Sequence, residues 1–311
     1  MRLKLILPFL LSCSVTLAAG PAEAQSHPRP RITGISHLAV YTSDPQATER
    51  YYTQVIGAAR QPDPENPKGV RYAINATQFV EVLPLPGCAG ICPNRMDHAG
   101  FQTDNAEGLR LYLKAKGWQT PANITHYSDG SKAFRVKDPE GNVIEFVEPS
   151  TKAAAPDAPH VIGHHVIHIG FLVHSREAED KFYRALLGFR PYWYGGMHDD
   201  KIEWVSQQTT DSHDWLEYMI KSPTDTISQQ TLGVLDHLSI GVISVPDSYK
   251  KLQSEGRLKD VRADQGPKVG KDGKYQFNMY DPDGIRLELM EFHAVEKPCC
   301  SEFTAEDPKP E

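Results

Sequence analysis

The amino-acid sequence predicts an α+β protein of four βαβββ modules, paired into two domains that each contain a cupped, mixed β-sheet. The first observation is a repeat of four strand-like segments, each with one histidine, spaced 61 to 70 residues apart. The second is an amphipathic helical pattern after each of them, followed by short strand patterns. The third is a segment rich in alanine and proline, residues 150–163, which separates the second module from the third.

Each module opens with a short apolar strand around its histidine. These strands are Ile35–Val40, Met96–Phe101, Val166–Phe171 and Leu235–Ile240. The helices expected next are Pro45–Ile56, Ala106–Lys116, Glu177–Leu187 and Pro246–Gly256, and a glycine stands at the end of each. The clearest closing strands are Thr77–Val82, Asn142–Val147, Trp215–Met219 and Ile285–Leu289. Two of these strands are entered through Asp-Pro-x-Gly turns, at residues 138–141 and 281–284.

The two ends of the chain differ in composition from the modules. Arg2 and Lys4 precede an apolar stretch, Leu5–Ala19, and small residues at 22–24 offer a cleavage site, which is typical of a signal peptide over residues 1–24. The stretch is shorter than the roughly 20 residues of a membrane span. We therefore expect an exported protein, periplasmic or secreted after cleavage near Ala24. Its domains are expected at 32–149 and 164–293, with a linker at 150–163 and a tail at 294–311.

Charge and cysteine content limit the partners. The net charge of −7 and the absence of basic runs argue against a nucleic-acid-binding surface, and no stable membrane span is expected. The expected partner is a small-molecule substrate, and the oligomeric state stays open. Four cysteines follow the expected signal peptide, and they allow three disulfide pairings, none of which the sequence selects. They are Cys88, Cys92, Cys299 and Cys300.

A His–Glu–His–Glu series recurs in both domains. The first domain has His37, Glu81, His98 and Glu145, and the second has His168, Glu217, His237 and Glu288. Each histidine is expected in the middle of an opening strand and each glutamate in the middle of a closing strand. Paired modules would bring the four strands of a domain together. Imidazole and carboxylate suit a divalent ion of zinc, nickel, cobalt, manganese or iron, with open positions for two neighbouring substrate oxygens.

The alternative for any one of these residues is structural. A single strand histidine is more often a core residue than a ligand, and a single strand glutamate more often faces solvent. Eight such residues in register with four repeats favour at least one metal site. The second domain is preferred, because five aromatic residues could form the wall of a pocket, although they could equally be core. They are Tyr192, Trp193, Tyr194, Trp204 and Trp215.

Several motifs resemble the glyoxalase/bleomycin-resistance/extradiol-dioxygenase superfamily, also called the vicinal-oxygen-chelate superfamily. The segment His168-Ile169-x-Phe171-x-Val173, with Phe182-Tyr183 and Leu187-Gly188-Phe189, resembles the motif that opens a glyoxalase I module. The segment Asp281-Pro282-Asp283-Gly284-x-x-Leu287-Glu288-Leu289 is similar to the motif that closes a module in this family. In the first half, His37 with Tyr51-Tyr52 and Ile56-Gly57 is a looser copy of the opening motif, and Asp138-Pro139-Glu140-Gly141-Asn142-x-Ile144-Glu145 is similar to the closing motif. The resemblance covers residues 32 to 293, and it implies glyoxalase-like domains with the eight residues above at the ligand positions.

The resemblance leaves three functions open. The first is a glyoxalase I-like lyase or isomerase, in which Glu217 or Glu288 takes a proton from a hydroxy-carbonyl substrate. An exported protein would not meet the cytosolic thiol glutathione, so a different substrate is expected. The second is an iron-dependent extradiol dioxygenase using His168, His237 and Glu288. Tyr280 abuts Asp281-Pro282, which departs from the dioxygenase signature. The third is a non-catalytic binding protein.

Overall fold

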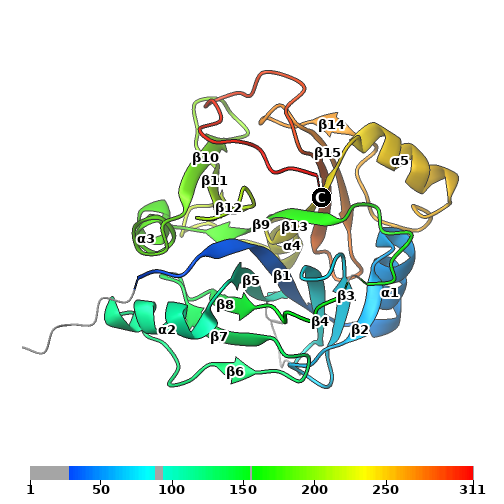
Figure 1. Ribbon diagram of the computed structural model, residues 1–311. Helices are drawn as coiled ribbons and strands as arrows, with labels where there is room; N and C mark the ends of the chain where they lie inside the picture. Colours follow the sequence, from blue (N-terminus) through cyan, green and yellow to red (C-terminus); the bar gives the residue numbers. More distant parts are fainter. Residues whose placement is uncertain (1–27, 88–93, 155, 311) are drawn as a thin grey trace, which may run out of the picture.

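The computed structural model describes residues 28–87, 94–154 and 156–310. The expected signal peptide and two of the cysteines, Cys88 and Cys92, lie outside the described residues. The described chain forms two curled, eight-stranded mixed sheets, and Figure 1 shows them as the lower and upper halves of the molecule. We call the sheet of β1–β8 the first cup and that of β9–β16 the second cup. The expectation of paired βαβββ modules is confirmed.

The first cup follows the order β2-β3-β4-β1-β5-β8-β7-β6. Its strands are β1 (Ile32–Thr42), β2 (Ala59–Pro62), β3 (Val70–Ala73), β4 (Phe79–Pro84), β5 (Met96–Thr103), β6 (Thr125–His126), β7 (Lys132–Lys137) and β8 (Val143–Glu148). The opening strands β1 and β5 run antiparallel at the centre, and each is parallel to the closing strand of its own module. The four strands expected to carry the ligands are therefore the four central ones.

The second cup repeats this order as β10-β11-β12-β9-β13-β16-β15-β14. Its strands are β9 (His165–Val173), β10 (Arg190–Gly195), β11 (Trp204–Gln208), β12 (Trp215–Ile220), β13 (His237–Val242), β14 (Lys268–Val269), β15 (Tyr275–Tyr280) and β16 (Arg286–Glu291). The central strands β9 and β13 are again antiparallel, and each pairs in parallel with a closing strand. The two cups therefore share one topology.

Side-chain caps and glycines mark the ends of most helices, as local chemistry predicts. They are α1 (Pro45–Arg50), η1 (Tyr51–Ile56), α2 (Ala106–Ala115), α3 (Arg176–Asp180), η2 (Lys181–Leu186), α4 (Gln229–Leu235) and α5 (Val245–Ser254). Side chains of Asp44, Asn105, Ser175 and Ser244 accept a backbone N–H at the start of α1, α2, α3 and α5. The predicted terminal glycines, such as Gly57 with φ +82° and Gly117 with φ +83°, adopt the left-handed conformation that ends a helix.

The structure corrects three details. The second halves of the expected helices at 45–56 and 177–187 are π-helices, η1 and η2, rather than α-helix. A helix that the sequence reading missed, α4, occupies residues 229–235. The expected strand Leu235–Ile240 therefore starts only at His237, which is the first residue of β13 and not its middle. The chain turns from α4 into β13 at Asp236, and this turn places His237 at the centre of the cup.

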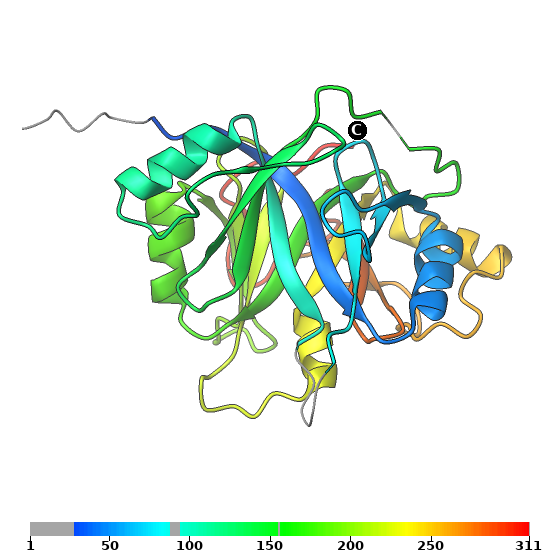
Figure 2. The ribbon, with the colours of Figure 1, turned by 90° about the horizontal axis from the view of Figure 1, so that it is seen from below.

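The cups are joined through one continuous core. Buried residues of both sheets form a single hydrophobic cluster. Figure 2 shows α1 close to α5 at one end of the molecule and α2 close to α3 at the other, so each helix pair joins modules of different cups. At the β1–β9 contact, the amide of Gln78 donates to the carbonyls of Ile35 and Val166 and accepts from the Val166 N–H. The domains are therefore packed as one body.

The C-terminal tail, red in Figure 1, packs on the second cup. The Thr304 N–H donates to the Tyr192 carbonyl at 2.9 Å, and the Gln208 amide donates to the Glu306 carbonyl at 2.7 Å. Cys299 and Cys300 in this tail form a disulfide with each other. Within the described part of the chain, no helix has the length and apolar character to cross a membrane.

Candidate metal centres

In the first cup the four predicted residues meet at one point. The Nε2 atoms of His37 and His98 are 2.8 Å apart. The Glu145 Oε2 atom lies 3.4 Å from both of these nitrogens, and the Glu81 Oε2 atom lies 3.3 Å from His98 and 4.0 Å from His37. Nitrogen and oxygen ligands bind such metals at about 2.0–2.2 Å, so two ligands of one ion are about 3–4 Å apart. The measured separations match that geometry.

Buried polar atoms of the first cup also fit a cation. Both carboxylate oxygens of Glu81 and Oε2 of Glu145 are buried without a hydrogen-bond partner among the described residues. Burial raises the pKa of Glu81 to about 9 and lowers that of His37 to about 4. Burial would also lower the pKa of His98, but its bonds to Asp97 and Glu145 raise it to about 9. A divalent ion would supply positive charge beside the Glu81 carboxylate and an acceptor for the free oxygen of Glu145 to bind.

Three residues that the sequence did not predict, Glu65, Arg71 and Arg135, cover the ligand cluster of the first cup. Arg71 faces Glu81 and Arg135 faces Glu145 across neighbouring strands. The Arg135 guanidinium lies 3.2 Å from Nε2 of His98, and it forms an ion pair with Glu65 from the loop between β2 and β3. Ligand atoms of Glu65, His98 and Glu145 lie within 4.8 Å of one another. Since all four predicted ligands are buried, this cover closes the first centre.

In the second cup the predicted residues also meet. The Nε2 atoms of His168 and His237 are 3.1 Å apart. The Glu288 Oε2 atom lies 3.2 Å from Nε2 of His168, and the Glu217 Oε2 atom lies 3.3 Å from Nε2 of His237. The two carboxylates therefore flank the imidazole pair. Ligand atoms of His168, Glu217 and His237 all lie within 4.8 Å of one another, as one ion requires.

Neighbouring groups set the protonation of the second centre. Nδ1 of His237 donates to the Leu235 carbonyl at 2.8 Å, which leaves the lone pair of Nε2 directed at the cluster. Burial and the nearby Arg286 lower the pKa of His237 to about 4. Burial would raise the pKa of Glu288, but the His168 hydrogen bond and Arg286 lower it to about 2. His237 is therefore a neutral imidazole and Glu288 an ionised carboxylate, which are the forms that bind metal.

The second cup is more open than the first. Ser206 faces Glu217 and Asn278 faces Glu288, at the register positions that hold arginines in the first cup. The side chain of Glu217 is 17% exposed, whereas that of Glu288 is 3% exposed and both imidazoles are buried. One carboxylate of the second centre therefore lies within reach of a ligand from solvent.

The expected aromatic wall is largely core. Tyr192, Trp193 and Trp215 are buried in one cluster, and Phe303 of the tail packs on Tyr192 with ring centroids 4.9 Å apart. Trp215 stacks on the His168 imidazole at 4.5 Å, as Phe79 stacks on that of His37 in the first cup at 4.6 Å. Of the other two aromatics, Trp204 is partly buried and Tyr194 is exposed. The cluster fixes one ligand ring rather than forming an empty pocket.

Two glycines that the sequence reading overlooked make room for the imidazoles. A Cβ atom at Gly100 would lie 2.3 Å from the His37 ring, and one at Gly170 would lie 2.1 Å from the His237 ring. Each glycine stands two residues after the other histidine of its cup, in His98-x-Gly100 and His168-x-Gly170. This repeated His-x-Gly spacing was the signal that could have identified them.

Comparisons with known proteins agree with this geometry. A family model described as the Glyoxalase/Bleomycin resistance protein/Dioxygenase superfamily matches residues 34–146 and 165–289. No curated protein matches the chain.

Solved structures with a similar fold include the 2,3-dioxygenase LapB from Pseudomonas sp. KL28, with a TM-score of 0.65 and 16% identity over 87% of this chain and 97% of the other. The Mn(II)-bound glyoxalase from Novosphingobium aromaticivorans gives 0.63 and 19% over 87% and 85%. Homoprotocatechuate 2,3-dioxygenase from Brevibacterium fuscum gives 0.62 and 16% over 91% and 85%. At these identities the similarity concerns the fold.

Proposed function

Because the chain belongs to the Glyoxalase/Bleomycin resistance protein/Dioxygenase superfamily, we propose that its second cup is the site of a metal-dependent lyase or isomerase. The substrate is a small hydroxy-carbonyl compound with two neighbouring oxygens. The metal is a divalent ion of zinc, nickel, cobalt, manganese or iron. The proposed ligands are His168, Glu217, His237 and Glu288.

The observation that carries this proposal is the exposure of Glu217. Its carboxylate belongs to the ligand cluster, yet 17% of its side chain is exposed, and Ser206 rather than an arginine faces it. A carboxylate that both approaches the metal position and meets solvent can exchange places with a substrate oxygen. Glu288 lies as close to its own histidine, 3.2 Å from His168, but only 3% of its side chain is exposed, so it has less access to a substrate from solvent.

Residues of the chain carry the proton and hold the metal ligands in place during the proposed reaction. A bound divalent ion supplies positive charge that acidifies a carbon next to a carbonyl group. The Glu217 carboxylate takes the proton from that carbon and returns it to the neighbouring atom of the substrate, so the protein is unchanged at the end. The Leu235 carbonyl holds His237 in one tautomer, and Trp215 holds His168 in place by stacking. These contacts keep the donor atoms fixed while the proton moves.

We assign a structural role to the first cup. It has the same donors, but Glu65, Arg71 and Arg135 cover them, and all four predicted ligands are buried. A closed set of ligands is typical of a structural metal site. His37, Glu81, His98 and Glu145 would then hold an ion that joins four strands.

An extradiol-type dioxygenase is the second candidate. His168 lies 3.1 Å from His237 and 3.2 Å from Glu288, and these three donors could form the facial triad of an iron oxygenase. Two of the similar folds described above are named as dioxygenases. The position of Glu217, 3.3 Å from His237, favours the first candidate, because a facial triad has only one carboxylate.

Metal analysis combined with two assays tests the proposal. Protein reconstituted with each ion should bind about one ion in the second cup and exchange a substrate C–H for deuterium from D₂O. The variant pair His168→Ala/His237→Ala should lose this ion and the exchange, and His37→Ala/His98→Ala serves as the matched control. Oxygen uptake with catechols, without exchange, would establish the dioxygenase instead. A chain that binds no metal would leave only a small-molecule binding protein.

A further inference from the structure

A guanidinium outside the four-ligand series lies beside the second centre. Arg286 is the first residue of β16, and it pairs with His237, the first residue of the neighbouring parallel strand β13. Arg286 also precedes Glu288 by two residues, so both side chains leave β16 on the same face. Neighbouring strands of a sheet are about 4.8 Å apart. Arg286 therefore flanks one imidazole and one carboxylate of the second ligand cluster.

The first cup shows that the fold requires no charge at this position. Its equivalent pair is His98 and Val143, in the same register on β5 and β8. Val143 likewise precedes the closing glutamate, Glu145, by two residues. The arginines of the first cup, Arg71 and Arg135, come instead from β3 and β7. The guanidinium beside the more open centre is thus a feature of the second cup alone at this position of the repeat.

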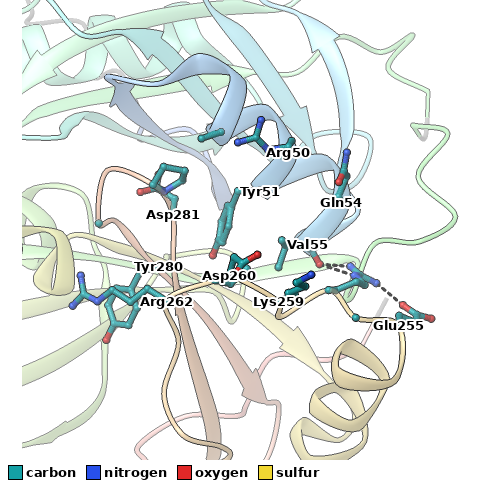
Figure 3. Close-up of a pocket in the computed structure, with 16 residues that line it drawn as sticks. Arg50, Tyr51, Gln54, Val55, Glu255, Lys259, Asp260, Arg262, Tyr280 and Asp281 are labelled. Atoms are coloured by element: carbon teal, nitrogen blue, oxygen red, sulfur yellow. Dashed lines mark hydrogen bonds and ion pairs between the residues drawn. The ribbon is translucent and has the colours of Figure 1, made fainter.

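Arg286 has no partner for its charge among the described residues. It forms no ion pair, hydrogen bond or ring contact with them, and its buried Nε atom has no acceptor. The residue opposite it on β15 is Tyr280, whose ring instead lies under the Arg262 guanidinium, 4.1 Å from the ring centroid (Figure 3). A buried donor without an acceptor is unfavourable, and a bound oxyanion would satisfy it with a charge-assisted hydrogen bond.

The charge of Arg286 acts on the ligands themselves. Burial lowers the pKa of His237, and the Arg286 charge lowers it further. Burial raises the pKa of Glu288, whereas the His168 hydrogen bond and then the Arg286 charge lower it. The guanidinium is therefore within electrostatic range of the ligand cluster, in agreement with its place in the register.

A bound divalent ion would leave the second centre with an excess of positive charge. Glu217 and Glu288 balance the two charges of the ion, and Arg286 adds a third. The nearby Asp272 does not balance it, because burial raises the pKa of Asp272 to about 7 and its carboxylate accepts from the Lys274 N–H at 3.1 Å. Solvent reaches the centre, since the Glu217 side chain is 17% exposed and Arg286 is half-buried. An anion from solvent would restore neutrality.

We propose that the substrate of the second cup carries an oxyanion group, a carboxylate or a phosphate, which the Arg286 guanidinium binds. Two neighbouring oxygens of the same molecule then approach the metal ligands. This inference rests on the proposed function and narrows its substrate to an anionic hydroxy-carbonyl compound. Because Arg286 and His237 are one strand apart, the oxyanion is only a few atoms from the chelating oxygens. The planar guanidinium suits such a group, since its N–H donors bind two oxygens at once.

Two pairs of small molecules test the inference, and the members of each pair differ mainly in the oxyanion group. Hydroxypyruvate has a carboxylate where hydroxyacetone has a methyl group, and dihydroxyacetone phosphate has a phosphate that dihydroxyacetone lacks. Calorimetry at constant ionic strength measures their binding to the metal-loaded full chain. At least one anion should bind about tenfold or more tightly than its neutral counterpart. The pair with the larger ratio distinguishes a carboxylate from a phosphate.

Variants assign this preference to one residue. Arg286→Gln, loaded with metal to the wild-type content, should reduce the ratio to about twofold or less. Arg286→Val should do the same, and it should fold because Val143 already occupies the equivalent position of the first cup. Arg262→Gln is the matched control: it removes the same charge from a residue held against Tyr280, and it should keep the wild-type ratio. An equal loss in Arg262→Gln, or no preference for either anion in the wild type, would overturn the inference.

The test separates this inference from the proposed function. Exchange of a substrate C–H for deuterium from D₂O follows the reaction, whereas calorimetry follows binding at Arg286. An anion preference that depends on Arg286, without any exchange, would support the anion site and overturn the lyase or isomerase. Exchange of the neutral and anionic compounds at equal rates, without a preference in binding, would overturn the anion site and leave the proposed function in place.

Discussion

The eight predicted ligands hold the same positions in the two cups, whereas the residues facing them differ. Arg71 and Arg135 face the glutamates of the first cup, and Ser206 and Asn278 face those of the second. The two guanidinium groups help to cover the ligands of the first cup, whereas the Glu217 side chain of the second cup is 17% exposed. We therefore expect the second cup to exchange its metal faster than the first.

The role of Glu217 can be tested by one substitution. Glu217→Gln keeps an oxygen donor but removes the proton acceptor, so we expect kcat to fall about 10²–10⁴-fold while KM changes little. Steady-state kinetics with the hydroxy-carbonyl substrate measures this, and metal content should stay near the wild-type value.

Glu81→Gln in the first cup is the control for this substitution. It should leave kcat unchanged, because Glu81 is covered and meets no substrate. A loss of turnover in Glu81→Gln together with normal turnover in Glu217→Gln would move the active centre to the first cup.

Gly170 should be intolerant of any side chain. In Gly170→Ala the new Cβ would lie 2.1 Å from the His237 ring, so the ring must turn away from the cluster. We expect weaker metal binding in the second cup and a loss of about 1–3 kcal/mol in the free energy of unfolding. Gly87→Ala is the control, since a Cβ there meets nothing within 4 Å. Full metal affinity in Gly170→Ala would contradict the assigned position of His237.

At the scale of elements, the sequence predicted the helix positions and helix ends that depend on local side-chain and backbone preferences. Periodicity located four of the helices, and terminal glycines located their ends, because left-handed backbone favours that residue. The helix α4 was missed, since Gln229–Leu235 is short and lacks an amphipathic repeat. The π-helical turns were missed as well. They depend on tertiary contacts such as that of Tyr52 with Asp281, which no local pattern encodes.

The Asp-Pro-Asp-Gly turn should make stability depend on pH. Burial raises the pKa of Asp281 from 3.8 to about 7, so the folded chain holds a proton that the unfolded chain releases. This contribution is complete below about pH 4 and is lost as the pH rises through about 7. In Asp281→Asn the free energy of unfolding should decrease with rising pH by about 1–3 kcal/mol less than in the wild type. Urea unfolding between about pH 5 and 8 measures the difference between the two curves, and parallel curves would exclude this group as the cause.

The C-terminal tail should depend on one buried ion pair. Nζ of Lys274 is fully buried, 2.7 Å from the Asp307 carboxylate, and donates to the Phe292 carbonyl. Asp307→Ala removes the counter-charge of a buried ammonium group, so we expect the free energy of unfolding, measured in urea, to fall by about 3–5 kcal/mol. The double variant Lys274→Met/Asp307→Ala should recover part of the lost stability, because it has no buried charge. If the double variant is no more stable than the single one, the ammonium charge is not the cause.

At the scale of the whole molecule, the repeat predicted the site better than any single residue did. His37, Glu81, His98 and Glu145 meet because four central strands converge, and the second series meets for the same reason. The covering residue Glu65 could not be predicted, because it reaches the first centre from a loop, outside the strands and helices that the repeat pattern located. The tail contacts of Asp307 were missed for the same reason.

Export is a prediction for the whole chain. Residues 1–24 have the composition of a signal peptide, so the protein recovered from an expressing bacterium should be outside the cytoplasm and begin near Gln25. N-terminal sequencing of the fractionated protein checks this. A cytoplasmic protein that begins at residue 1 would contradict it, and a glutathione adduct would then become an admissible substrate.

The amide of Gln78 restricts how this protein can move. It bonds to β1 and β9 on either side, within a hydrophobic cluster that spans both cups. Hinged enzymes open and close by rotating one domain against another about a few backbone residues. Such a rotation here would break a continuous interior, so the two cups keep a fixed mutual orientation. Access to the second centre then depends on smaller segments such as the C-terminal tail, in which the Lys309 carbonyl contacts His165 and the Asp307 carboxylate accepts from Lys274.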